Sequence, residues 1–141
     1  MEFRILGPLE VWDGGGGVAI PRRQQRVLLA ALLDRAGDVV SVDRLVDDLW
    51  GEHPPAAAVG GLQNTVSQLR KLLGAEVLRR QPPGYLLDVA ADAIDARRFE
   101  RLVAAAAELE PAGRANALRE ALALWRGPAL ADLAAEPWAA V

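Results

Sequence analysis

Cysteine is absent from this chain of 141 residues, and His53 is its only histidine. The missing thiols exclude disulfides and thiolate zinc sites, and one imidazole is too few for most metal centres, so we expect no metal and no cofactor. No apolar run approaches the roughly 20 residues that cross a bilayer, and the first residues lack the basic and apolar regions of a signal peptide. We therefore expect the protein in the cytoplasm.

Residue sets that would carry catalysis are also missing. His53 has no serine, cysteine or second histidine near it in the sequence, as a catalytic group would need. Asp47 and Asp48 are adjacent on a predicted helix, where neighbours diverge by about 100°, so we expect both to be solvated. The glycines at 14–17 precede "VAIP" and not Lys-Ser/Thr, and are predicted to form a turn instead of a phosphate cradle. An enzyme is the least favoured class.

We expect three tryptophans to be packing residues, namely Trp12, Trp125 and Trp138.

Acidic residues are absent from one predicted helix, "LQNTVSQLRKLLG" at 62–74, although the whole chain has a formal net charge of -3. Its leucines and valine repeat at spacings of four, three and four, which predicts one buried stripe. Amides, hydroxyls and cations of these types can pair with bases and phosphates in a major groove, yet a plain amphipathic helix has the same stripe, and both interpretations stay open on this segment alone. The stripe contains Leu62, Val66, Leu69 and Leu73, and the opposite arc contains Asn64, Ser67 and Lys71, flanked by Gln63, Gln68 and Arg70.

The positive charge is local. Between residues 56 and 85 four cations face one carboxylate, a net charge of +3, whereas after Tyr85 six arginines face nine carboxylates, a net charge of -3. A basic segment within an acidic chain indicates a surface for nucleic acid, because the distribution of charge matters more than its sum.

The order of predicted elements favours a DNA-binding fold. The strands "FRIL", "LEVW" and "VAIP" form an antiparallel meander, and a helix follows with Pro21 in its first turn. A short strand "VVS" leads to a helix "VDRLVDDLW" capped by Ser41. After the helix at 62–74, "VLRR" and "YLLD" form a hairpin across "QPPG". Three helices followed by such a wing are typical of a winged helix-turn-helix whose last helix enters the major groove.

From Ala93 onward the chain is rich in alanine, and Pro111 separates two amphipathic helices. Such a pair is the unit of tetratricopeptide-like arrays, which need about three repeats, so the second domain is expected to be incomplete. The predicted fold class is α+β. The predicted domains are a winged-helix DNA-binding domain at 1–90 and the start of a helical second domain at 91–141.

Several segments together resemble the SARP family, the Streptomyces antibiotic regulatory proteins. The resemblance implies that 1–90 is an OmpR-type winged-helix DNA-binding domain and that 91–141 is the start of a helical bacterial transcriptional activation domain. The resemblance runs through "RQQRVLLAALLDRAGDVVSVDRLVDDLWGEHPP", "VSQLRKLLG", "PPGYLLD", "DARRFERLV" and "ALALWRGPALADL", in the family's order and spacing. It implies a transcription activator that binds direct repeats of double-stranded DNA in the promoters of specialised-metabolite genes. Such an activator is expected at the nucleoid. It also implies contact with RNA polymerase holoenzyme, through sigma factor region 4 or the alpha subunit.

The resemblance also assigns site residues. It places Asn64, Thr65 and Gln68 near bases, Ser67, Arg70 and Lys71 near phosphates, and the indole of Trp50 on a phosphate. Many members carry Arg at the position of Gln68 and an aromatic residue or His at that of Thr65, so the preferred bases stay open. Arg79 and Arg80 lie before the hairpin tip, where successive strand residues point to opposite faces, so at most one is predicted to enter a minor groove while its neighbour meets a phosphate or solvent. The alternative, that both only keep the hairpin soluble, stays open. The polymerase-contacting loop is predicted to contain Gly51, Glu52, His53, Pro54 and Pro55.

Two further expectations concern assembly and class. The short second domain predicts a monomer in free solution, with any dimer on DNA formed through winged-helix contacts. The rival function is a helical or winged-helix protein-interaction module without DNA binding, which would need exposed Leu, Phe or Tyr on the arc of the helix at 62–74 and on the wing.

Overall fold

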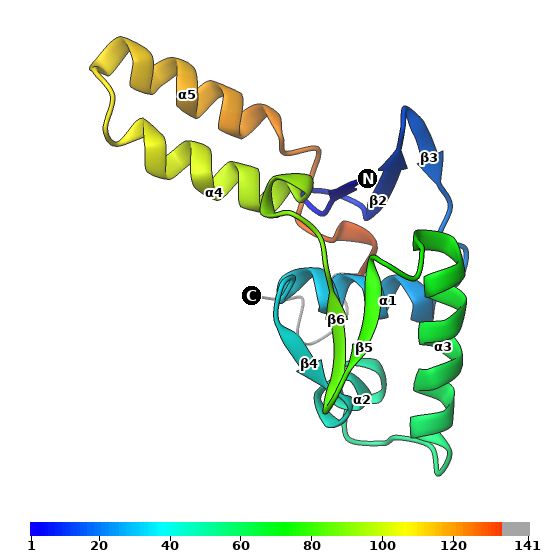
Figure 1. Ribbon diagram of the computed structural model, residues 1–141. Helices are drawn as coiled ribbons and strands as arrows, with labels where there is room; N and C mark the ends of the chain where they lie inside the picture. Colours follow the sequence, from blue (N-terminus) through cyan, green and yellow to red (C-terminus); the bar gives the residue numbers. More distant parts are fainter. Residues whose placement is uncertain (134–141) are drawn as a thin grey trace. The chain divides into compact units, whose positions relative to one another are not determined.

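A computed structural model describes residues 1–133 of the chain, and the prediction for Trp138 lies outside these residues. The chain forms two compact units, one of residues 18–90 and one in which residues 1–17 join the chain from residue 91 onward. The predicted mixed fold of antiparallel strands and helices is confirmed (Figure 1).

Three helices form the body of the first unit. Helix α1 (Arg23–Asp34) begins two residues after Pro21, which we expected inside its first turn. Every residue from 27 to 33 is buried, because both α2 and α3 pack against this helix. Helix α2 (Val42–Trp50) begins where predicted, with the Ser41 hydroxyl accepting a hydrogen bond from the backbone N–H of Arg44 at 3.1 Å. Helix α3 (Ala58–Leu73) begins before the predicted segment.

The wing of this unit is a three-stranded sheet. Strands β5 (Leu78–Gln81) and β6 (Gly84–Leu87) form the predicted hairpin, and β4 (Val39–Ser41) pairs antiparallel with the other side of β6. Gly84 faces Ser41 in this pairing, and a Cβ on it would lie 1.8 Å from the carbonyl oxygen of Val40. Only glycine therefore lets β4 approach β6 this closely.

The core of this unit confirms the predicted stripe of α3. Leu62, Val66, Leu69 and Leu73 are all buried. They share one core with buried leucines from α1, α2 and the hairpin. The opposite side of α3 is therefore left for solvent or a partner. The fully buried leucines of the unit include Leu28, Leu32, Leu45, Leu78 and Leu87.

The second unit combines the first strands with the last helices. Strands β1 (Glu2–Arg4), β2 (Glu10–Asp13) and β3 (Gly16–Val18) form the predicted meander, in the order β1-β2-β3. The predicted position of the third strand is wrong, because Gly16 and Gly17 lie in β3 and not in the turn, and the strand ends at Val18. Helices α4 (Asp95–Ala106) and α5 (Pro111–Ala123) pack side by side as the predicted helical hairpin (Figure 1). Short 3₁₀ turns lie at Ala91–Ala93 and Ala131–Leu133.

A buried carboxylate ties the meander to α4. Asp95, the first residue of α4, accepts hydrogen bonds from the backbone N–H groups of Ile5 at 2.8 Å and Leu6 at 3.1 Å, and it is 2% exposed. Phe3 also forms a bridge with Ile94 just before the helix. The grouping of residues 1–17 with the helical unit differs from the predicted bounds 1–90 and 91–141, which stay a prediction.

Between residues 1 and 133, none of the helices combines the length and the apolar character that crossing a bilayer requires.

Candidate nucleic-acid interface

The outer arc of α3 carries polar and basic side chains without a carboxylate. Gln63, Asn64, Ser67 and Lys71 are exposed, and Gln68 and Arg70 are half-buried at the edges of the arc. The last turn contains Arg70 and Lys71, where cations interact favourably with the negative end of the helix dipole. The arc presents amides and a hydroxyl in the middle and a cation at one end, which suits contact with bases and phosphates.

Thr65 lies on the buried side of α3, not on the arc. It is 5% exposed, and its hydroxyl donates a hydrogen bond to the backbone carbonyl of Gly61 at 2.9 Å. A side chain so placed has its donor occupied and little surface for a base. The position near bases that the resemblance implied for Thr65 does not fit this geometry, and we leave Thr65 out of the proposed base-reading set.

Gln68 is held by a second amide that the sequence analysis did not single out. Gln25 of α1 is 4% exposed, and its Nε2 donates a hydrogen bond to Oε1 of Gln68 at 2.9 Å. The Oε1 of Gln25 accepts from the backbone N–H of Arg22 at 3.4 Å. A signal for Gln25 was present, because a glutamine one turn before the buried Leu28 and Leu29 falls on the buried face and needs a hydrogen-bonding partner there.

Trp50, at the end of α2, packs against the start of α3. Its six-membered ring lies close to Gly61, because the absence of a side chain at this position of α3 leaves room for the ring. Trp50 is half-buried, and within residues 1–133 its indole N–H has no recorded hydrogen-bond acceptor. The predicted phosphate contact of this N–H stays a prediction.

The two arginines of the wing have different surroundings. Arg79 forms an ion pair with Asp88, at 2.7 Å between Nη2 and Oδ2. Arg80 is exposed and, among the described residues, has no recorded ion pair; it lines a hollow of about 140 Å³ between α3 and the hairpin tip. Gln63 of α3 lines the same hollow. Arg80 is therefore the wing cation that adjoins the arc of α3.

The loop between α2 and α3 is solvent-exposed along its whole length, from Gly51 to Ala57. Its five predicted polymerase-contacting residues are thus accessible, and the two prolines, Pro54 and Pro55, limit its backbone freedom.

On α2, the expectation that Asp48 is solvated is wrong, because its side chain is only 12% exposed. Burial raises the pKa of Asp48, while Arg44, at 3.6 Å, acts in the opposite direction.

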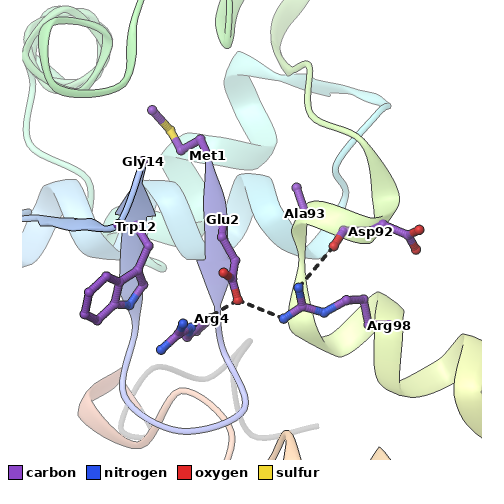
Figure 2. Close-up of a pocket in the computed structure, with 9 residues that line it drawn as sticks. Met1, Glu2, Arg4, Trp12, Gly14, Asp92, Ala93 and Arg98 are labelled. Atoms are coloured by element: carbon purple, nitrogen blue, oxygen red, sulfur yellow. Dashed lines mark hydrogen bonds and ion pairs between the residues drawn. The ribbon is translucent and has the colours of Figure 1, made fainter.

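A second hollow, of about 420 Å³, lies in the other unit and is lined by charged side chains (Figure 2). Glu2 lies between Arg4 and Arg98 and accepts hydrogen bonds from both, at 3.1 and 2.9 Å. The guanidinium of Arg4 also lies 4.8 Å from the ring centroid of Trp12. The Arg98 hydrogen bond is the largest cause of the lowered pKa of Glu2. The arginines of this hollow are already paired with Glu2, so these ion pairs connect β1 to α4, and the hollow is not an open anion site.

Comparisons with known proteins identify the class of both units. Residues 18–87 match the family described as "Transcriptional regulatory protein, C terminal", and residues 94–141 match the "Bacterial transcriptional activator domain". The chain belongs to the SARP family, whose regulators join these two parts.

Curated relatives carry regulatory names. The chain is 40% identical over 138 residues to "Regulatory protein AfsR" of Streptomyces coelicolor, covering 94% of this chain and 14% of that protein. It is 38% identical over 143 residues to "Transcriptional regulator RedD" of the same species, covering 94% and 41%. It is 40% identical over 148 residues to "Regulatory protein DnrI" of Streptomyces peucetius, covering 94% and 54%. The chain therefore spans between 14% and 54% of the length of these relatives.

A solved structure supports the fold. The chain matches Mycobacterium tuberculosis EmbR, solved in complex with a low affinity phosphopeptide, with a TM-score of 0.90 and 36% identity, over 99% of this chain and 39% of that one. This similarity confirms the winged helix followed by a helical part.

Proposed function

We propose that the chain is the DNA-binding part of a transcription activator, in which α3 reads bases in a major groove and the wing contacts the flanking DNA. The observation that carries the proposal is the outer arc of α3, where Asn64, Ser67 and Lys71 are exposed and no carboxylate occurs along Ala58–Leu73. Carboxylates near phosphates would be repelled, so their absence from this one helix of an acidic chain favours DNA as its partner.

The proposed contacts fall into three groups. Asn64 and Gln68 read bases, Ser67, Arg70 and Lys71 bind phosphates, and the indole of Trp50 donates to a phosphate. Of the wing arginines, Arg80 contacts DNA first, because Arg79 is already paired with Asp88. The α2–α3 loop, exposed from Gly51 to Ala57, is the surface for RNA polymerase holoenzyme, through sigma factor region 4 or the alpha subunit.

The family supports the wider role. Relatives are named as regulators, and we infer that this chain acts at promoters of specialised-metabolite genes, on direct repeats of double-stranded DNA in the cytoplasmic nucleoid. Two copies would meet on adjacent repeats as a dimer on DNA. We propose that residues 1–90 and 91–141 correspond to the two functional domains.

The rival function, a protein-interaction module, requires apolar side chains on the arc. Val59 is 52% exposed near the beginning of α3, and it is the single large hydrophobic residue of that helix with such exposure. The polar remainder of the arc favours nucleic acid over a protein partner.

A binding titration at several salt concentrations tests the proposal. The protein is titrated onto a promoter fragment with two spaced repeats and onto a fragment with scrambled repeats. We expect tighter binding to the intact repeats, and log K that falls linearly with log salt because phosphate contacts release counterions. Equal affinity for both fragments, or binding that does not depend on salt, would contradict the proposal and favour a protein partner.

A further inference from the structure

Gln25 lies on α1, away from the outer arc, and its side chain forms a hydrogen bond with Gln68, one of the two proposed base-reading residues. The Nε2 of Gln25 lies 2.9 Å from Oε1 of Gln68, and this hydrogen bond is part-buried, with Gln25 itself only 4% exposed. Gln68 is half-buried and projects from the same helix as the exposed Asn64. Its amide is thus anchored on one side and open on the other.

The direction of these hydrogen bonds is fixed by the backbone. The N–H of Arg22 can only donate, so the group of Gln25 that faces it must be the amide oxygen. The NH₂ of Gln25 then points toward Gln68, and because an NH₂ also only donates, Gln68 must turn its oxygen inward. The NH₂ of Gln68 is the group left to face outward.

We propose that Gln25 is a positioning residue that makes Gln68 present only hydrogen-bond donors to DNA, and so sets the base that Gln68 selects. This inference rests on the proposed function of α3. Bidentate pairing of a glutamine with adenine needs the amide oxygen and NH₂ directed at the same base edge. The bond to Gln25 takes the oxygen of Gln68 out of that arrangement.

The expected preference follows from the major-groove edges of the bases. Guanine offers two acceptors, N7 and O6, whereas cytosine offers only an N4 donor. A Gln68 that presents donors therefore ranks guanine first and cytosine last at its position. We expect about a fivefold preference for guanine over cytosine, near the lower end of what a bidentate pair gives.

Two substitutions change the polarity in different ways. In Gln25→Glu, an ionised carboxylate can only accept, so Gln68 must reverse its amide, donate inward and present its oxygen to DNA. The ranking then reverses, with cytosine above guanine by about fivefold. In Gln25→Leu, Gln68 loses its anchor and is free to pair bidentately, so adenine becomes the preferred base.

The experiment measures binding of the full chain to DNA fragments that carry each of the four bases at every position of one repeat. The position read by Gln68 is the one at which Gln68→Ala removes the preference. Gln24→Glu is the matched control, because it adds the same charge on the same helix at an exposed position and should keep the ranking of the unchanged protein. Circular dichroism on each variant establishes that it is folded before its binding is compared.

Guanine first in the unchanged protein, cytosine first in Gln25→Glu and adenine first in Gln25→Leu would support the proposal. One ranking shared by all folded variants, or adenine first in the unchanged protein, would overturn it. If Gln25→Glu does not fold, the change from guanine to adenine in Gln25→Leu decides the matter. Failure of the unchanged protein to distinguish any DNA sequences would instead refute the proposed function of α3, and this inference with it.

Discussion

The six-membered ring of Trp50 lies directly over Gly61, with Cζ2 and Cη2 each 3.3 Å from the position that a Cβ on Gly61 would occupy. This contact joins the end of α2 to the first turns of α3. It orients the helix that we propose to read DNA, and it sets a limit on the size of the residue at position 61.

Gly60→Ala and Gly61→Ala form a matched pair that measures this contact. Alanine is favoured over glycine inside a helix by about 0.5 to 1 kcal/mol, and a Cβ on Gly60 meets no atom within 4 Å. We expect Gly60→Ala to raise the free energy of unfolding by that amount and Gly61→Ala to raise it less or lower it, because Trp50 must move. Urea unfolding gives both values, and an equal gain in both variants would show that Trp50 does not constrain α3.

Glu2→Gln should lower stability in a pH-dependent way. The pKa of Glu2 is lowered mainly by its hydrogen bond with Arg98, so its contribution is complete above the ordinary value of 4.5 and is lost as the pH falls through the lower folded-state pKa. We expect a loss of at most about 1 kcal/mol at pH 7 that disappears in acid. Thermal unfolding from pH 7 to pH 3 checks this, with the exposed Glu108→Gln as control; a loss that is unchanged at pH 3 would contradict it.

The wing arginines should differ on DNA. Arg79 is held by Asp88, whereas Arg80 lines the hollow beside α3. We expect Arg80→Ala to reduce the slope of log K against log salt by about 1, or to remove a preference for AT-rich flanks, and Arg79→Ala to change either quantity less. Salt titrations on two flank compositions make the comparison. A larger effect from Arg79→Ala would show that the ion pair with Asp88 opens on DNA.

The α2–α3 loop should act after DNA binding. A Glu52→Ala, His53→Ala double variant changes two exposed side chains outside the arc of α3. We expect unchanged affinity for promoter DNA and reduced transcription in a reconstituted assay with RNA polymerase holoenzyme. Weakened DNA binding would move these residues into the DNA-contacting group, and full activation would remove the loop from the proposed polymerase surface.

Local sequence patterns predicted the element order, because each signal lies within a few residues: the Ser41 cap, the leucine stripe of α3 and the turn at Pro82. The early beginning of α3 was missed, since two adjacent glycines are poor helix formers, and the packing of Trp50 against Gly61 exists only once the chain is folded.

Contacts between residues that are distant in the sequence could not be predicted from those local patterns. Asp95 is one carboxylate among many in the sequence, and its bonds to Ile5 and Leu6 exist only once the chain is folded. The candidate site shows the same limit. The arc of α3 was predictable from helical spacing, and that spacing also places Thr65 beside Leu62 and Leu69 on the buried side, against the role implied by resemblance.

Asn64→Ala provides the most direct test of base reading by α3. Asn64 is exposed in the middle of the arc, and its amide can pair with an adenine edge. Affinities of the unchanged protein and the variant are measured on the specific repeat and on random DNA under one salt condition. Our account predicts a loss of about 1 to 3 kcal/mol on the repeat and little change on random DNA. Equal losses on both DNAs, or no loss on either, would contradict the claim that α3 reads sequence.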